Sequence, residues 1–212
     1  MFTGIVEELG TVHAISKTAR SSRLHIRADT IMSDIHLGDS IAVNGVCLTA
    51  DELTQDGFIA DVMPQTMQFT SLGNLSLESK VNLERAMSAN GRFGGHIVSG
   101  HVDGIGKICN IRKDDIAIWI EISTERNLIN QMIDKGSICL DGVSLTIAKL
   151  NADRFAVSLI PHTQGHTTLF EKRMGDCINI ETDVVGKYIS RFLVVEKSVT
   201  LTIDTLADAG FL

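Results

Sequence analysis

Proline is nearly absent from this chain of 212 residues, which has only Pro64 and Pro161. Cysteine is scarce too, and the four cysteines show no short paired spacing. This argues against a disulfide framework and a Cys-x-x-Cys metal site, and it favours reduced thiols in the cytoplasm. No apolar run approaches the roughly 18 residues that a membrane span needs. Residues 1–8 have neither a basic region nor an apolar stretch, so we expect no signal peptide.

Positive charge is also in short supply, because 19 Lys and Arg face 26 Asp and Glu, for a net charge of −7. Binding to a phosphate backbone needs a basic face, so we expect no nucleic-acid partner. The chain has no GxSxG sequence and no GxGxxG sequence ahead of a helix. The signatures of an esterase nucleophile and of a dinucleotide-binding fold are therefore missing.

What the chain does contain is an internal repeat. Residues 40–84, shifted by 97 positions, fall on residues 137–181 with 15 identities in 45, and the two prolines coincide. At the front the shift is 96, which places residues 3–7 on 99–103. A repeat of about 100 residues is a whole domain, far longer than a solenoid unit. We therefore predict two like domains, 1–96 and 97–183, followed by an unrepeated segment, 184–212.

Both copies alternate apolar and polar residues with a period of two, which is typical of β-strands. The expected strands are 5–12, 22–27, 40–43, 46–53, 57–63 and 80–84, then 99–112, 116–123, 136–140, 143–150, 154–160 and 176–182. Short helices are expected at 30–35, 65–71, 126–133 and 162–169. Six short strands at this spacing favour a closed antiparallel barrel, because closure removes exposed edges. The predicted fold is all-β, with two tandem six-stranded barrels, short helices and a C-terminal helix.

The C-terminal helix is predicted from the segment after Asp183, whose apolar residues share one helical face. These are Val185, Tyr188, Ile189, Phe192 and Leu193. One interpretation is a helix that packs on its own barrel, and the other is a contact between subunits.

The two copies differ at polar positions in a way that suggests two bound ligands held alike but handled differently. The differing pairs are Ile5 and His101, Asn44 and Asp141, Cys47 and Ser144, Gln65 and His162, and Ala86 and Asp183. Such differences suit a donor site and an acceptor site. Ordinary drift after duplication is the alternative explanation.

Two residues stand out as candidates for chemistry. Cys47 lies in a strand-like run, where most cysteines are small core residues, but its counterpart Ser144 is also small and polar. His101 is our preferred group for proton handling, because its counterpart is Ile5. His96 precedes His101 by five residues in strand-like sequence, so the two side chains are expected on opposite faces. No third ligand accompanies any histidine pair, and we expect no metal site.

Taken together, the motifs of this chain resemble the riboflavin synthase family of the alpha-chain type. The resemblance rests on residues 1–6, 44–49, 94–102, 135–138, 141–146 and 160–163, in this order. It extends from Met1 to about Tyr188 and includes the duplication for which the family is known.

The resemblance implies two Greek-key barrels and a defined reaction. Two molecules of 6,7-dimethyl-8-ribityllumazine exchange a four-carbon unit and give riboflavin and 5-amino-6-ribitylamino-uracil, the last step of riboflavin biosynthesis. No cofactor or metal is implied. The family forms homotrimers through the C-terminal helix, with the reactive site between the first barrel of one subunit and the second barrel of a neighbour. Association with lumazine synthase is left open.

The resemblance also implies site residues, which are carried over by motif. The reactive groups are Phe2, Cys47, His101, Ser144, Thr146 and Asp183. The lumazine-binding set of the first copy is Gly4, Ile5, Val6, Cys47, Leu48, Thr49, Asp61, Val62, Met63, Pro64, Gln65 and Thr66. That of the second copy is Gly100, His101, Val102, Lys135, Ser144, Leu145, Thr146, Ile160, Pro161, His162, Thr163, Gln164 and Gly165.

The chemistry leaves two assignments open. The C7 methyl protons of one lumazine are acidic, and the base that removes one is His101, Asp183 or a water that they hold. The nucleophile at C7 of the other lumazine is water, a ligand hydroxyl, Ser144 or Cys47. Stacking the two rings in the right orientation is expected to contribute more than either group.

A second class of protein shares this fold and lacks the reaction. The lumazine and flavin proteins of bioluminescent bacteria bind one chromophore, and their second-copy motifs are degraded. Here the second copy keeps Ser-Gly-His-Val at 99–102, Gly-Val-Ser-Leu-Thr at 142–146 and Ile-Pro-His-Thr at 160–163. We therefore expect the enzyme rather than the binding protein.

Overall fold

The structure is a computed structural model that describes residues 1–17 and 21–197. The side chains of His162, Gln164 and residues 194–197 fall outside this description, as do residues 198–212 at the end of the predicted C-terminal segment. Within the described part, none of the helices is long and apolar enough to cross a membrane.

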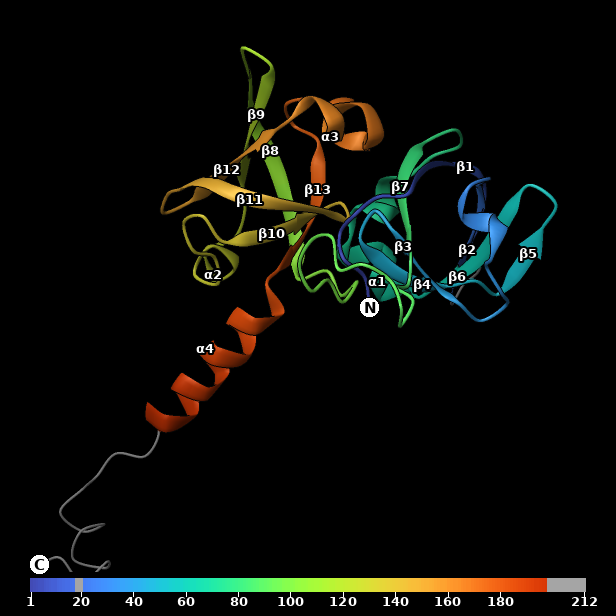
Figure 1. Cartoon of the computed structure of the whole chain (residues 1–212), viewed down its shortest axis with the longest axis horizontal. Coiled ribbons are helices and arrows are strands. Elements are labelled where there is room, and N and C mark those ends of the chain that lie inside the picture. The colour runs from blue at the N-terminus through green and yellow to red at the C-terminus, as the bar shows by residue number, and fades with distance from the viewer. Residues whose placement is uncertain (18–20, 198–212) are drawn as a thin grey trace, which may run out of the picture.

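The first half is an antiparallel sheet that curls around its own core, as Figure 1 shows on one side of the molecule. Its strands follow the order β4-β3-β7-β1-β2-β6-β5. They are β1 (Glu8–Lys17), β2 (Ser22–Arg27), β3 (Ser40–Val43), β4 (Val46–Thr49), β5 (Glu52–Thr54), β6 (Gly57–Val62) and β7 (Lys80–Arg85). The short helices are η1 (Ile31–Ser33), α1 (Pro64–Phe69) and η2 (Ser71–Asn74).

The second half is a closed antiparallel barrel with the strand order β10-β11-β12-β9-β8-β13. Its strands are β8 (Gly104–Asp114), β9 (Ala117–Ser123), β10 (Ser137–Leu140), β11 (Val143–Leu150), β12 (Arg154–Leu159) and β13 (Cys177–Thr182). Its helices are α2 (Arg126–Ile129), α3 (Pro161–His166) and η3 (Thr168–Phe170), and α4 (Val184–Lys197) follows the barrel.

The prediction of two six-stranded barrels is confirmed, with one local difference. The first half has the same cyclic strand order as the second, but β4 and β5 together take the place of the single strand β11. The predicted strand 46–53 is broken at Ala50 and Asp51, where the amide of Asp51 bonds the carbonyl of Ile59. Proline begins α1 and α3, as expected at the first turn of a helix.

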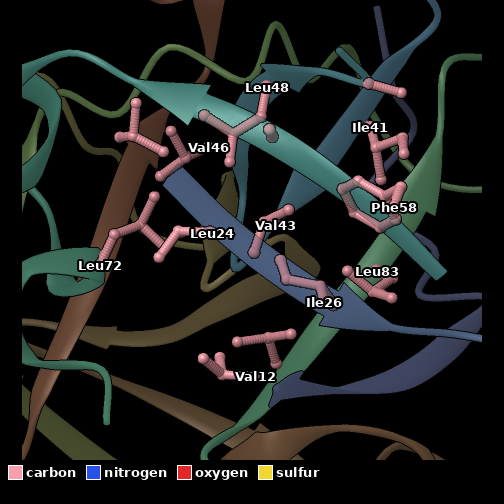
Figure 2. Close-up of a cluster of buried hydrophobic side chains, with 14 of the residues drawn as sticks. Val12, Leu24, Ile26, Ile41, Val43, Val46, Leu48, Phe58, Leu72 and Leu83 are labelled. Atoms are coloured by element: carbon pink, nitrogen blue, oxygen red, sulfur yellow. The ribbon is translucent and has the colours of Figure 1, made fainter. Parts of the chain in front are cut away.

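Each half has its own apolar core, built from the inward-facing residues of its strands. Figure 2 shows the first core, in which Leu24, Ile26, Phe58 and Leu83 converge. Ile120, Ile122 and Phe155 occupy the corresponding place in the second core. Burying one such side chain contributes about 1.5–3 kcal/mol, so each half has a core of ordinary domain size.

The first strand of each half starts later than predicted, at residue 8 instead of 5 and at 104 instead of 99. The residues before each strand form two arms, which we call the N-terminal arm (1–6) and the middle arm (98–102). Val6 of the N-terminal arm packs on the core of the second half, and Val102 of the middle arm packs on the core of the first half. Phe2 and Val98 join the two arms through an antiparallel bridge. The two halves therefore exchange arms.

A buried glutamate holds each arm. Glu84 accepts hydrogen bonds from the amides of Thr3 and Gly4 and from the Thr3 hydroxyl, at 2.7–2.9 Å. Glu181 accepts the same three bonds from the middle arm, from the amide and hydroxyl of Ser99 and the amide of Gly100, at 2.6–3.0 Å. Burial raises the pKa of the Glu84 carboxyl, and the bonds from the arm oppose this rise.

Paired asparagines connect the halves across their interface. Asn82 donates from its side chain to the carbonyl of Asp141, and Asn179 donates to the carbonyl of Asn44, both at 2.8 Å. The turns at Gly45 and Gly142 touch so closely that a Cβ on either glycine would lie within 3 Å of the other turn's backbone. Glycine is required at both places, because each also has a positive φ.

One pair of residues breaks this symmetry. Asp141 is fully buried and pairs with Lys172 at 2.8 Å, whereas the first half has Asn44 and Leu75 at the matching positions. Burial raises the pKa of the Asp141 carboxyl, and Lys172 opposes this rise. The interface between the halves therefore contains one buried ion pair, and the matching positions of the first half are uncharged.

Helix α4 leaves the second barrel and extends away from both halves (Figure 1). Asp183 caps it by accepting a hydrogen bond from the amide of Val185 at 2.9 Å. The five residues of its predicted apolar face are half exposed or more, from 50% at Val185 to 65% at Phe192. The interpretation of a helix that packs on its own barrel is therefore wrong.

Lys172→Leu should lower the free energy of unfolding by about 3–5 kcal/mol at neutral pH, because it leaves a buried carboxylate without its partner. Removing Lys172 also raises the pKa of Asp141 further, so the folded protein binds a proton that the unfolded chain has released. The loss should therefore shrink as the pH falls through that raised pKa. Urea unfolding at several pH values measures both effects.

The matched control is the double variant Asp141→Asn with Lys172→Leu, which copies the neutral pair of the first half. It should recover the stability to within about 1 kcal/mol, because a neutral pair needs no charge compensation. A single variant as stable as the double variant at neutral pH would contradict the role of the ion pair.

Candidate functional site

The second half carries an open pocket on the outer side of its barrel, with a volume of about 490 Å³. Strands β11 and β12 form its floor, and Ser144 and Ser158 mark two of its sides. Six of the predicted site residues line it, namely Lys135, Ser144, Leu145, Thr146, Ile160 and Thr163. Polar side chains over a strand surface suit a flat heterocycle with a hydroxylated chain.

Each arm also contacts the other half. Ser144 donates its amide to the carbonyl of Gly4 at 2.7 Å, and Cys47 donates its amide to the carbonyl of Gly100 at 2.9 Å. Gly4 of the first copy therefore lies beside Ser144, and Gly100 of the second copy lies beside Cys47.

His96 is the functional candidate that the sequence patterns missed. Its Nδ1 lies 2.7 Å from the Oγ of Ser144, at the end of the pocket where Gly95 also lies. Burial lowers the pKa of the His96 imidazole, and the carboxylates of Asp183 and Glu181 act against this. A neutral imidazole on a serine hydroxyl is the arrangement that increases the nucleophilicity of serine or relays its proton. The assumption of a straight strand through 96–101 hid this contact.

His101 and Asp183, the two expected proton-handling groups, differ in exposure. His101 is exposed, and its amide donates to the hydroxyl of Ser99 at 3.3 Å. Asp183 is half-buried at the start of α4, and its charge acts on His96. Ser144 thus contacts His96, on whose pKa Asp183 acts, and His101 stands on the arm that contacts Cys47 through Gly100.

Three predicted site residues have side chains that face away from any pocket. Phe2 is 0% exposed, between the halves, where it packs with Val98 and Cys139. Leu48 and Val62 lie in the first core. The burial of Phe2 favours a packing role over direct contact with a ligand. Leu48 and Val62 can offer only backbone groups to a ligand.

The remaining first-copy residues form a more open surface. Asp61 is exposed and accepts a hydrogen bond from Arg23 at 3.0 Å. Cys47 and Thr66 are half-buried. The others are exposed, namely Thr49, Met63, Pro64 and Gln65. In the second copy Pro161 and Gly165 are exposed, and the side chains of His162 and Gln164 lie outside the described residues.

Metal binding finds no support in the described part of the chain, where no group of three or more His, Cys, Asp or Glu could hold an ion. The buried Cys139 has its pKa raised by burial, which makes it a packing residue and not a thiolate.

Comparison with known proteins places the chain in a family. The model of the lumazine binding domain matches residues 3–86 and 99–183. The riboflavin synthase of Bacillus subtilis is 51% identical over 215 residues, and that of Actinobacillus pleuropneumoniae is 49% identical over 215 residues. Both alignments cover 100% of both chains.

The structure of LumP complexed with riboflavin has a TM-score of 0.80 and 26% identity, covering 86% of this chain and 99% of LumP. LumP complexed with 6,7-dimethyl-8-(1'-D-ribityl) lumazine gives a TM-score of 0.78, and its complex with flavin mononucleotide gives 0.77. With both halves matched by the domain model and full-length relatives at about half identity, this chain belongs to the lumazine-binding family, together with the riboflavin synthases.

Proposed function

We propose that this protein is a riboflavin synthase that converts two molecules of 6,7-dimethyl-8-ribityllumazine into riboflavin and 5-amino-6-ribitylamino-uracil. The observation that carries the proposal is that matching positions of the two halves carry unlike polar atoms. Ser144 with His96 borders the second-half pocket, and Cys47 lies beside the arm of His101 on the matching surface of the first half. A transfer between two identical molecules needs such a difference, because one molecule is the donor and the other the acceptor.

The pocket of the second half suits one lumazine with its reacting ring close to Ser144. Backbone groups of β11, in the run of Leu145 and Thr146, are placed to bond the polar edge of the ring. Ile160 and Thr163 close the side of the pocket. The matching surface of the first half binds the second lumazine against Cys47 and Thr49, with Asp61 and Thr66 at its border.

Proton transfer follows from the same placement. The neutral His96 accepts a proton from the Ser144 hydroxyl, and Asp183 stabilises the imidazolium that forms. The attacking oxygen at C7 is then Ser144 itself or a water held by it. His101 remains the candidate base for the C7 methyl proton of the other lumazine. The reaction proposed needs no cofactor, since the ring itself delocalises the charge.

Assembly completes the proposal. The exposed apolar face of α4 is suited to a homotrimer in which the first barrel of one subunit faces the second barrel of another. Segments 1–96 and 97–183 are then the two lumazine-binding units, and 184–212 is the oligomerisation segment. We further propose a cytoplasmic enzyme, and association with lumazine synthase remains a separate proposal that its own binding assay would test.

Turnover is the direct test of this function. Chelator-treated protein mixed with 6,7-dimethyl-8-ribityllumazine alone should form riboflavin, detected by its absorbance, with half the substrate recovered as the pyrimidine product. Tight binding of lumazine with no riboflavin formed would place the protein with the chromophore-binding proteins instead.

Substitutions at matched positions should have unequal effects. His101→Ala should lower kcat on the order of 10²-fold, as expected for loss of a general acid or base, and Ile5→Ala should lower it far less. Cys47→Ala and Ser144→Ala should also differ from each other in kcat. Steady-state rates of the four variants measure this, and equal losses within each pair would contradict the assignment of donor and acceptor.

A chain that ends at Asp183 tests the assembly. It lacks α4, so light scattering should report a smaller species than the full-length protein. Its turnover should fall as well, because the site needs a neighbour. An unchanged mass would show that α4 does not hold the subunits together, and a small but fully active species would place the site within one chain.

A further inference from the structure

The second-half pocket ends at a feature that its reaction does not use. Ala148 and Ser158 line this end, and Ser158 is the strand partner of Trp119, the chain's only tryptophan. Cross-strand partners point to the same face of a sheet, so the Trp119 ring stands on the pocket face of the barrel. The β8–β9 hairpin that carries Trp119 projects beyond the barrel in Figure 1.

Two cations flank this tryptophan. The Nζ of Lys149 lies 5.3 Å from the centroid of the Trp119 ring, and the Cζ of Arg112 lies 5.7 Å from it. Arg112 is paired with Asp114 at 2.9 Å. Lys149 is exposed and takes part in none of the ion pairs between described residues. The charge of Lys149 is therefore available to a ligand, and the Trp119 ring packs beside the Lys149 side chain.

The matching end of the first half has the opposite charge. By strand register Arg23 pairs with Asp61, as Trp119 pairs with Ser158. Arg23 contacts three carboxylates, those of Asp51, Glu52 and Asp61, at 3.0–3.4 Å. In the repeat, Glu52 is the counterpart of Lys149. Arg23 and its three carboxylates have a negative sum of charges, which repels an anion. Lys149, Arg112 and the single carboxylate of Asp114 have a positive sum, which attracts one.

This inference rests on the proposed function, which sets the orientation of the ligand along β11. The reacting ring must lie by Ser144, at one end of the pocket. Ala148 lies four residues further along β11, about 13 Å away at the usual rise per strand residue. The five-carbon ribityl chain is the part of the ligand that extends in that direction, so its terminal hydroxyl approaches Lys149 and Trp119.

We propose that Lys149, Arg112 and Trp119 form an anion-binding subsite that recognises a terminal phosphate on the ribityl chain. A phosphate monoester carries about −1.5 to −2 charges at pH 7, which Lys149 can meet. The ligand class is the ribityl phosphates of flavins and lumazines, with flavin mononucleotide as the probe. The second-half pocket therefore binds the phosphate ester of the product riboflavin in competition with lumazine, and the acidic surface of the first half excludes it.

The test compares flavin mononucleotide with riboflavin in calorimetric titrations of the full-length protein. Lys149→Ala should weaken binding of flavin mononucleotide about fivefold to tenfold, as expected for one exposed charge contact, and leave riboflavin within twofold. Rising salt should weaken binding of flavin mononucleotide and not of riboflavin. The matched control is Lys113→Ala, which removes a neighbouring exposed lysine that pairs with Ile118 and not with Trp119. It should leave both ligands within twofold.

Inhibition and fluorescence measurements show where flavin mononucleotide binds. Flavin mononucleotide should inhibit lumazine turnover competitively, less in Lys149→Ala, and should quench the emission of Trp119 saturably. Equal changes for both flavins in Lys149→Ala, or an effect of Lys113→Ala as large as that of Lys149→Ala, would overturn the subsite. Absence of turnover by the unaltered protein would instead overturn the proposed function, so the two failures are distinguishable.

Discussion

The structure depends on two buried carboxylates, each of which ties the arm of its own half to the last strand of that half. Glu84 and Glu181 each accept three hydrogen bonds from an arm, and in doing so they satisfy buried amides that no strand pairs. An ionised acceptor makes stronger bonds than a neutral one, and a buried carboxylate without such donors would be costly. Because these clamps fix Gly4 and Gly100, they also fix the backbone against which Ser144 and Cys47 stand.

The two halves have nearly the same backbone, but their side chains differ in charge and reactivity. The interface has a buried ion pair on one side and a neutral pair on the other. The two proposed lumazine-binding surfaces differ in the same way. The second half has Ser144 with His96 and a cationic end at Lys149, whereas the first half has Cys47 and an acidic end around Arg23. The common backbone keeps two identical molecules in matching positions, and the side chains decide what happens to each.

Much of the fold could be predicted because it depends on local alternation. The period of two located the strands within a few residues, and the repeat gave the number of barrels. The arms could not be predicted, since Ile5 and Val6 alternate like any strand residue and the pattern does not say which core Val6 enters. For the same reason the motifs pointed to residues that line the pocket near Ser144 but did not show that each arm contacts the other half.

The contact of His96 with Ser144 was also out of reach, because it joins residues 48 positions apart that only the fold brings together. Phe2 shows the reverse case. Its place in a motif suggested chemistry, whereas its burial shows that it packs the arms against each other. A motif match identifies which residues belong to a site region, and only the geometry distinguishes those that touch a ligand from those that support it.

The arm exchange has a consequence for the order in which the molecule is made. The N-terminal arm leaves the ribosome before residue 144 exists, and Val6 reaches its final place only on a core built from residues 108–180. Thr3 and Gly4 can bond Glu84 once the first half is made, but Val6 and the carbonyl of Gly4 must wait until most of the second barrel has been synthesised. Contacts of such long sequence separation form late and slow folding. The duplicated gene thus encodes two barrels that mature together, because neither is finished until the other is.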